Sequence, residues 1–95
     1  MSDLRIEKAH SFDFATARTQ AQKWLQEAQA EFGLQATYHQ GDNVDTATIK
    51  KSGVDAKAVL DADKIVFEAD FNFLAKLFKG VIQNGIQQGL DKFFA

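Results

Sequence analysis

Hydrophobic and polar positions alternate in several short stretches of this chain. Leu4 and Ile6 alternate with Arg5 and Glu7, a period of two that predicts a half-buried strand at residues 3–9. The same pattern predicts four further strands, at residues 34–38, 44–51, 54–60 and 65–71. The turns between these four are too short to hold a crossover helix, so the strands should pair antiparallel. Residues 44–51 are rich in threonine and charge, and the pattern leaves their register undetermined.

Residues 13–32 change to apolar spacings of three and four, the period of an amphipathic helix. Ser11 or Asp13 is placed to accept hydrogen bonds from the first free backbone N–H groups. Gly33 is placed to end the helix, because glycine adopts the left-handed conformation without steric cost. The pattern therefore predicts both the helix and its two ends.

A second amphipathic helix is predicted over residues 72–93, with Asn72 or Asp70 as its N-cap. Gly85 and Gly89 lie four residues apart on its apolar face. Each costs about 0.5–1 kcal/mol relative to alanine inside a helix. Two explanations fit: close packing against the sheet or the first helix, or a helix that is held weakly and lifts toward a partner.

These elements predict one α+β domain over residues 1–95, a length that suits a single small domain. Its two layers are a five-stranded antiparallel sheet and two helices on one face, in the order β-α-β-β-β-β-α. Large apolar side chains on the inward positions form the predicted core: Phe14, Leu25, Phe32, Ile65, Phe67, Leu74, Phe78 and Ile82.

Composition excludes several classes of protein. With 45% hydrophobic residues, 25% charged residues and a net charge of −2, the chain has an ordinary globular composition. It has no cysteine, which fits a reducing cytoplasm, and no apolar run resembling a signal or a membrane span. Eleven basic against thirteen acidic residues disfavour nucleic acid binding. We therefore expect a cytoplasmic protein with neither nucleic acid nor a transmembrane segment.

No set of residues points to catalysis. His10 and His39 are possible metal ligands, but two histidines without a third ligand at a recognisable spacing do not make a site. No serine lies in a nucleophile-elbow sequence, and no glycine-rich loop joins a strand to a helix. We expect no catalytic residue, no metal, no cofactor and no enzymatic activity.

The C-terminal segment differs from the rest in charge and aromatic content. Residues 71–95 carry a net charge of +2 and five of the nine phenylalanines, whereas residues 1–70 carry −4. On a helical wheel Phe73 and Phe94 lie off the core stripe, near Lys76 and Lys79. These four residues are the candidate contact surface for a hydrophobic partner with anionic groups at its edge. Alternatively, the two rings are unremarkable exposed side chains, or the terminus folds Phe94 back onto the protein.

Several groups of residues resemble one protein family. They are His10-Ser11, Ala17-Arg18, Phe32-Gly33-Leu34, Ser52-Gly53-Val54 and the closing run Phe73-Leu74, Lys79-Gly80, Ile82, Ile86 and Leu90-Asp91. Together they resemble the polyhydroxyalkanoic acid system proteins, small bacterial proteins associated with polyester storage granules. The resemblance implies a non-enzymatic accessory or granule-associated protein in the cytoplasm, with the granule periphery as one location. Its implied partners are the granule surface, a granule protein or a second copy of the chain.

Two other functions stay open at this stage. A sheet covered by helices can enclose a small hydrophobic, acyl-like ligand. An enzyme is the third possibility, for which the chain offers no residue set. Co-purification with granules would favour the accessory protein, whereas a bound hydrophobic molecule would favour the ligand-binding domain.

Overall fold

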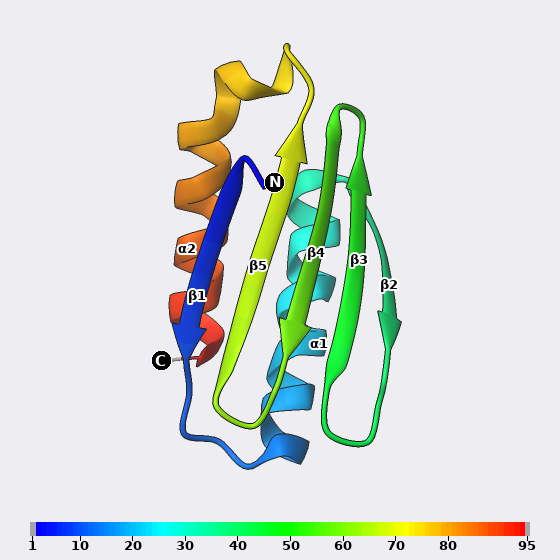
Figure 1. Ribbon diagram of the computed structural model, residues 1–95, viewed down its shortest axis with the longest axis vertical. Helices are drawn as coiled ribbons and strands as arrows, with labels where there is room; N and C mark the ends of the chain where they lie inside the picture. Colours follow the sequence, from blue (N-terminus) through cyan, green and yellow to red (C-terminus); the bar gives the residue numbers. More distant parts are fainter. Residues whose placement is uncertain (1, 95) are drawn as a thin grey trace.

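The computed structural model describes residues 2–94 and contains one antiparallel sheet and two α-helices (Figure 1). The elements are β1 (Leu4–Ala9), α1 (Phe14–Phe32), β2 (Gln35–His39), β3 (Asp45–Lys51), β4 (Val54–Leu60), β5 (Lys64–Phe71), the short 3₁₀ helix η1 (Ala75–Phe78) and α2 (Lys79–Phe94). The predicted α+β fold and the order β-α-β-β-β-β-α are confirmed.

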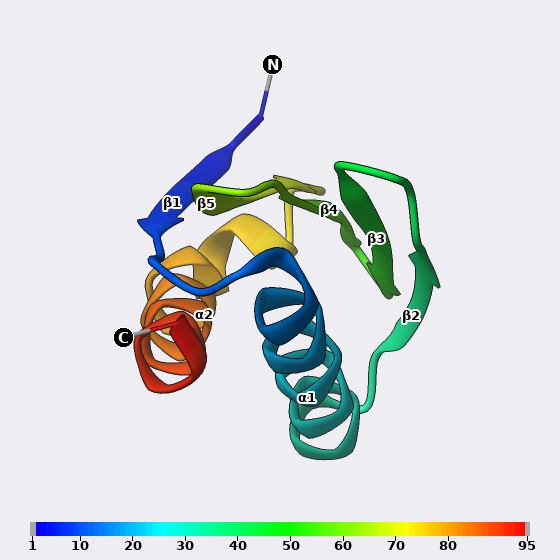
Figure 2. The same ribbon diagram turned by 90° about the horizontal axis from the view of Figure 1, so that it is seen from below.

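The five strands lie in the order β1-β5-β4-β3-β2, and every neighbouring pair is antiparallel. Both helices cover the same face of this sheet, as Figure 2 shows. The β3–β4 turn is tight because Gly53 adopts a φ of 82°, a conformation that favours glycine. Because both helices lie on one side of the sheet, each strand has one face toward the helices and one toward solvent.

Both ends of α1 lie at the capping residues that the sequence predicts. Of the two candidate caps, Asp13 is the one used: its carboxylate accepts a hydrogen bond of 2.7 Å from the N–H of Thr16. Gly33 ends the helix in the left-handed conformation, with φ 63° and ψ 35°, and its N–H donates to the carbonyl of Gln29. Five side chains of the inward stripe are buried: Ala17, Ala21, Trp24, Leu25 and Ala28.

The second helix is not the continuous element predicted over residues 72–93. The chain first forms η1 and then α2 from residue 79. Asn72 caps the start as predicted, since its side-chain oxygen accepts from the N–H of Ala75 at 2.8 Å. Figure 1 shows η1 beyond the tip of β5, which ends at Phe71. The start of this segment therefore has no sheet beneath it.

This position explains why part of the predicted core is wrong. Leu25, Ile65 and Phe67 are buried, and Phe14, Phe32 and Ile82 are partly buried. Leu74 and Phe78, by contrast, are 66% and 59% exposed. Their spacing gives them an apolar face, but that face extends past the end of the strands. The buried residues of α2 are instead Ile86, Leu90 and Phe94.

The two glycines of α2 lie where it meets α1. A Cβ atom on Gly89 would lie 2.8 Å from Nε1 of Trp24, and one on Gly85 would lie 3.1 Å from Cζ of Phe32. Real side chains do not approach so closely without movement of a neighbour. Of the two explanations for these glycines, close packing against the first helix is therefore confirmed.

A buried carboxylate lies at the start of β3. Asp45 is 1% exposed and accepts hydrogen bonds from Arg18 (2.6 and 2.8 Å), from the Tyr38 hydroxyl (2.6 Å) and from the N–H of Gly41 (3.0 Å). Burial alone raises the pKa of Asp45, but these hydrogen bonds outweigh it and hold the pKa below 3.8. The network joins α1 to the β2–β3 connection, and Asp45 lies opposite Leu60 of β4.

The first prediction contrasts two phenylalanines. Replacing Phe67 by alanine should lower the free energy of unfolding by about 3–5 kcal/mol, because its ring is 2% exposed and its loss leaves a void. Phe78→Ala should cost much less, since that ring is 59% exposed. Urea denaturation of both variants measures the difference. Equal losses would contradict the placement of η1 outside the core.

The second prediction concerns Asp45. Replacing it by asparagine should destabilise the fold toward the low end of the roughly 3–5 kcal/mol for breaking a buried pair, because Arg18 still reaches solvent. The folded-state pKa is depressed, so this contribution is present above pH 3.8 and is lost as pH falls through the folded-state value. Denaturation curves from pH 7 to pH 3 should show a shallower acid loss for Asp45→Asn than for the wild type.

Candidate functional site

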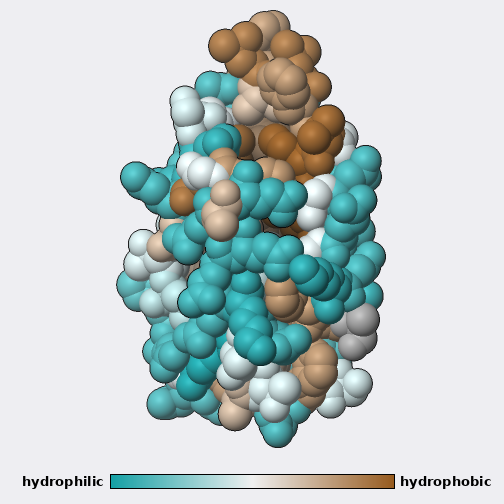
Figure 3. All heavy atoms as spheres, turned by 180° about the vertical axis from the view of Figure 1, so that it is seen from behind, coloured by the Kyte–Doolittle hydropathy of each residue, from teal (hydrophilic) through white to brown (hydrophobic). Residues whose placement is uncertain are grey.

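Five large apolar side chains lie exposed on one short segment. We call Phe73, Leu74, Leu77, Phe78 and Val81 the apolar crown; their exposed fractions range from 59% to 83%. Figure 3 shows apolar side chains gathered at one protruding end of the molecule, the end that η1 forms. Scattered exposed apolar residues need no explanation, but a cluster of this kind is typical of a contact surface.

Three of the four residues predicted as a contact surface lie in this region. Phe73 belongs to the crown, and Lys76 and Lys79 are exposed within the same segment. Lys76 forms an ion pair with Asp3, with 3.7 Å between Nζ and Oδ1. Two further crown residues, Leu74 and Phe78, were predicted to be in the core, because their spacing is the same as that of a buried helix face.

Phe94 does not belong to this surface and corrects the prediction. It is 1% exposed, and its ring centroid lies 5.9 Å from that of His10 and 6.4 Å from that of Phe12. The helical wheel placed it off the stripe because it assumed one continuous helix from residue 72. The buried stripe of α2 instead runs through Ile86 and Leu90 to Phe94. The alternative that the terminus folds this ring back onto the protein is the correct one.

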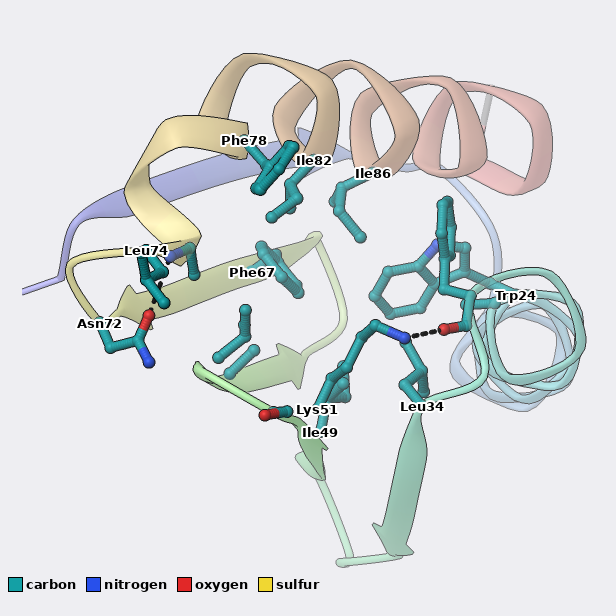
Figure 4. Close-up of a pocket in the computed structure, with 16 residues that line it drawn as sticks. Trp24, Leu34, Ile49, Lys51, Phe67, Asn72, Leu74, Phe78, Ile82 and Ile86 are labelled. Atoms are coloured by element: carbon teal, nitrogen blue, oxygen red, sulfur yellow. Dashed lines mark hydrogen bonds between the residues drawn. The ribbon is translucent and has the colours of Figure 1, made fainter.

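An apolar cavity of about 440 Å³ lies next to the crown, between the sheet and the two helices. Figure 4 shows Phe67 of β5 on the sheet side, Trp24 on the α1 side, and Ile82 and Ile86 of α2 facing them. Phe78 of the crown also lines this space. The volume is within the range of about 300–1,000 Å³ that is usual for small-molecule sites.

Three polar residues line the cavity as well: Lys51, Ser52 and Asn72. Lys51 ends β3 and Ser52 begins the β3–β4 turn, while Asn72 is held beside that turn by a hydrogen bond of 2.9 Å from its N–H to the carbonyl of Gly53. A Cβ atom on Gly53 would lie 2.9 Å from the Asn72 side chain, so glycine is required there. Among the described residues 2–94, none of those that line the cavity is acidic.

The Lys51 ammonium donates a hydrogen bond to the carbonyl of Phe32 at the end of α1, drawn as a dashed line in Figure 4. A lysine at a helix C-terminus is favourable, because the free carbonyls there carry partial negative charge. An ammonium has three donors, and this contact uses one of them. No pattern in the sequence around Lys51 indicates a cavity.

The two histidines lie in different surroundings. His10 follows β1, and its Nε2 lies 3.0 Å from the carbonyl of Asp61, while His39 is exposed at the end of β2. Within residues 2–94, no group of three or more His, Cys, Asp or Glu side chains is arranged to hold a metal ion. Over the same residues, no helix is long and apolar enough to cross a membrane.

Comparison with curated proteins finds no match to this chain. Comparison with protein-family models finds one, described as "Putative polyhydroxyalkanoic acid system protein", which matches residues 4–94. The match extends from the start of β1 to the end of α2 and so includes the crown and the cavity. The chain therefore belongs to the family of polyhydroxyalkanoic acid system proteins.

Proposed function

We propose that this protein is a non-enzymatic accessory of polyhydroxyalkanoate storage that binds the hydrophobic surface of the polyester granule through the apolar crown. Its location would then be the cytoplasm, at the granule periphery. The observation that carries the proposal is the exposure of the five crown side chains, 59–83% each, on a segment of nine residues. The family supplies the storage context.

The outer part of the crown contributes little to the fold. Phe73, Leu77 and Val81 are 71–83% exposed, and none of the three lines the cavity. Apolar surface kept in water gains nothing in the free protein, whereas its transfer to an apolar phase is favourable by about 25 cal/mol per Å². The crown also protrudes from one end of the molecule, as Figure 3 shows. A protruding apolar end suits insertion into a broad, soft surface better than it suits a shaped groove.

The charges support the same orientation. Lys76 and Lys79 lie among the crown residues, so their alkyl stems can lie along an apolar surface while the ammonium groups meet anionic groups at its edge. Anionic groups at a surface would therefore be attracted by the two lysines of the crown segment.

A second candidate function, binding of a small hydrophobic ligand, is favoured by a different observation. The apolar cavity of about 440 Å³ is adjacent to the crown but is lined mainly by other residues. The two functions are compatible, because Phe73, Leu77 and Val81 face away from the cavity and remain available to a surface when it is filled.

The third prediction tests the crown. Replacing Phe73 and Leu77 together by serine should leave the melting temperature within a few degrees of the wild type and lower binding to protein-free amorphous poly(3-hydroxybutyrate) particles at least tenfold. Sedimentation of the protein with the particles measures binding. The control is Val44→Ser, which removes an apolar side chain that is 45% exposed at the opposite end of the molecule, in the β2–β3 connection (Figure 1).

The control should sediment like the wild type. Wild-type binding only to granules that retain their proteins would point to a granule protein as partner and overturn the proposal. A change in oligomeric mass of the double variant, without any change in particle binding, would assign the crown to contact between copies of the chain. Full particle binding by the double variant would exclude the crown as the binding surface.

A further inference from the structure

We infer that the apolar cavity binds one medium-length alkyl chain that ends in a carboxylate, with Lys51 as the partner of the carboxylate. This inference rests on the second candidate function, ligand binding. It adds the chemical class of the ligand and the residue that recognises it. A plain fatty acid and a hydroxyalkanoic acid share this chemistry.

The walls define the chain part of the ligand. Trp24, Phe67 and Ile86 are buried apolar residues from three different elements, and they meet around one space (Figure 4). Apart from Lys51, Ser52 and Asn72, every residue that lines the cavity is apolar. A chain without polar groups is the complement of such walls, because any polar atom carried into them would lose its hydrogen bonds with water.

The polar residues define the other end of the ligand. Lys51, Ser52 and Asn72 all have hydrogen-bond donors. The Asn72 side-chain oxygen already accepts from the N–H of Ala75, which leaves its NH₂ group for a ligand. The part of the chain that the structure describes lines the space with one cation and no carboxylate, so a ligand that accepts hydrogen bonds and carries negative charge fits best.

The polar residues come from neighbouring segments around the β3–β4 turn, but their side chains diverge: in Figure 4 Asn72 lies beside η1 and Lys51 reaches toward α1. Lys51 pairs with Val54 across the β3–β4 turn, and Val54 pairs with Phe71 of β5, next to Asn72. The Lys51 ammonium reaches the last turn of α1, where one of its three donors bonds to the Phe32 carbonyl. Two donors remain for a ligand, so the contact with α1 holds the ammonium in place without occupying it fully.

Crown side chains form part of the same cavity. Leu74 and Phe78 line it and yet are 66% and 59% exposed, so their inner sides are only partly covered by the protein. An alkyl chain in the cavity would cover that surface. Without a ligand, the cavity is therefore open on this side. A core that served only stability would be close-packed there.

The test is a titration followed by the emission of Trp24, the single tryptophan of the chain and a wall of the cavity. Decanoate and 3-hydroxydecanoate represent the two sources, and decan-1-ol is the probe without charge. Decanoate or its 3-hydroxy derivative should bind at least tenfold more tightly than decan-1-ol. From hexanoate to decanoate, each added methylene should tighten binding about fourfold.

Lys51→Met should remove the preference for the carboxylate, so that decanoate and decan-1-ol bind with similar affinity, whereas Lys51→Arg should retain the preference. The matched control is Lys50→Met, which alters the exposed neighbour that does not line the cavity. Thermal melts of each variant check that loss of the contact with Phe32 has not unfolded it.

The outcomes distinguish a failure of ligand binding from a failure of the role assigned to Lys51. If no probe changes the Trp24 emission or binds by calorimetry, both the ligand-binding function and this inference fail. If decan-1-ol binds as tightly as decanoate, or if Lys51→Met keeps the preference, ligand binding stands and the role of Lys51 is wrong. If only 3-hydroxydecanoate shows the preference, the inference holds and the ligand is a hydroxyalkanoic acid.

Discussion

The close approach of α1 and α2 at two glycines is the contact on which the shape of the apolar site depends. At Gly89 and Gly85 the missing Cβ atoms leave room for Trp24 and Phe32 of the other helix. Trp24 also packs edge-on against Phe67 of the sheet, with 6.2 Å between ring centroids. One indole is therefore held by both helices and the sheet, and its position sets one wall of the cavity. Larger residues in place of these glycines would push the helices apart.

The end of β5 at Phe71 is the second constraint. The chain continues through η1 beyond the end of β5 before α2 packs against β1 and α1, and the apolar residues of that interval are left largely exposed. Apolar surface left in water contributes nothing to the stability of the free protein. Its presence on a segment that also supplies a wall of the cavity is the reason to place both proposed functions at this end of the molecule.

The crown and the cavity share Leu74 and Phe78, so events at one should affect the other. A ligand that covers the inner sides of these residues would fix the orientation of η1, which carries much of the crown. By linkage, a surface that binds the crown would alter the affinity of the cavity by the same factor. For a member of a polyester-storage family, this coupling would join the binding of an acyl chain to the binding of a polymer of acyl units.

Much of this architecture follows from local sequence patterns. Alternation of apolar and polar residues predicted the strands, and the capping chemistry of Asp13 and Gly33 predicted the bounds of α1, because both depend on neighbours within a few residues. The family, too, was recognisable from the chain alone. The register of β3 was not, because its threonine-rich and charged pattern does not distinguish the pairings with β2 and β4 that the structure shows.

The residues of the candidate site could be identified only from the tertiary structure. Periodicity shows that residues 72–93 have an apolar face, but it does not show what covers that face. Leu74 and Phe78 are exposed because they border the open cavity at the end of the sheet, and Phe94 is buried because the last turn of α2 reaches His10 and Phe12. Lys51 meets the cavity only because β3 and α1 end at the same edge of the fold. A one-dimensional pattern records the polarity of each position, whereas burial depends on which distant segments lie against it.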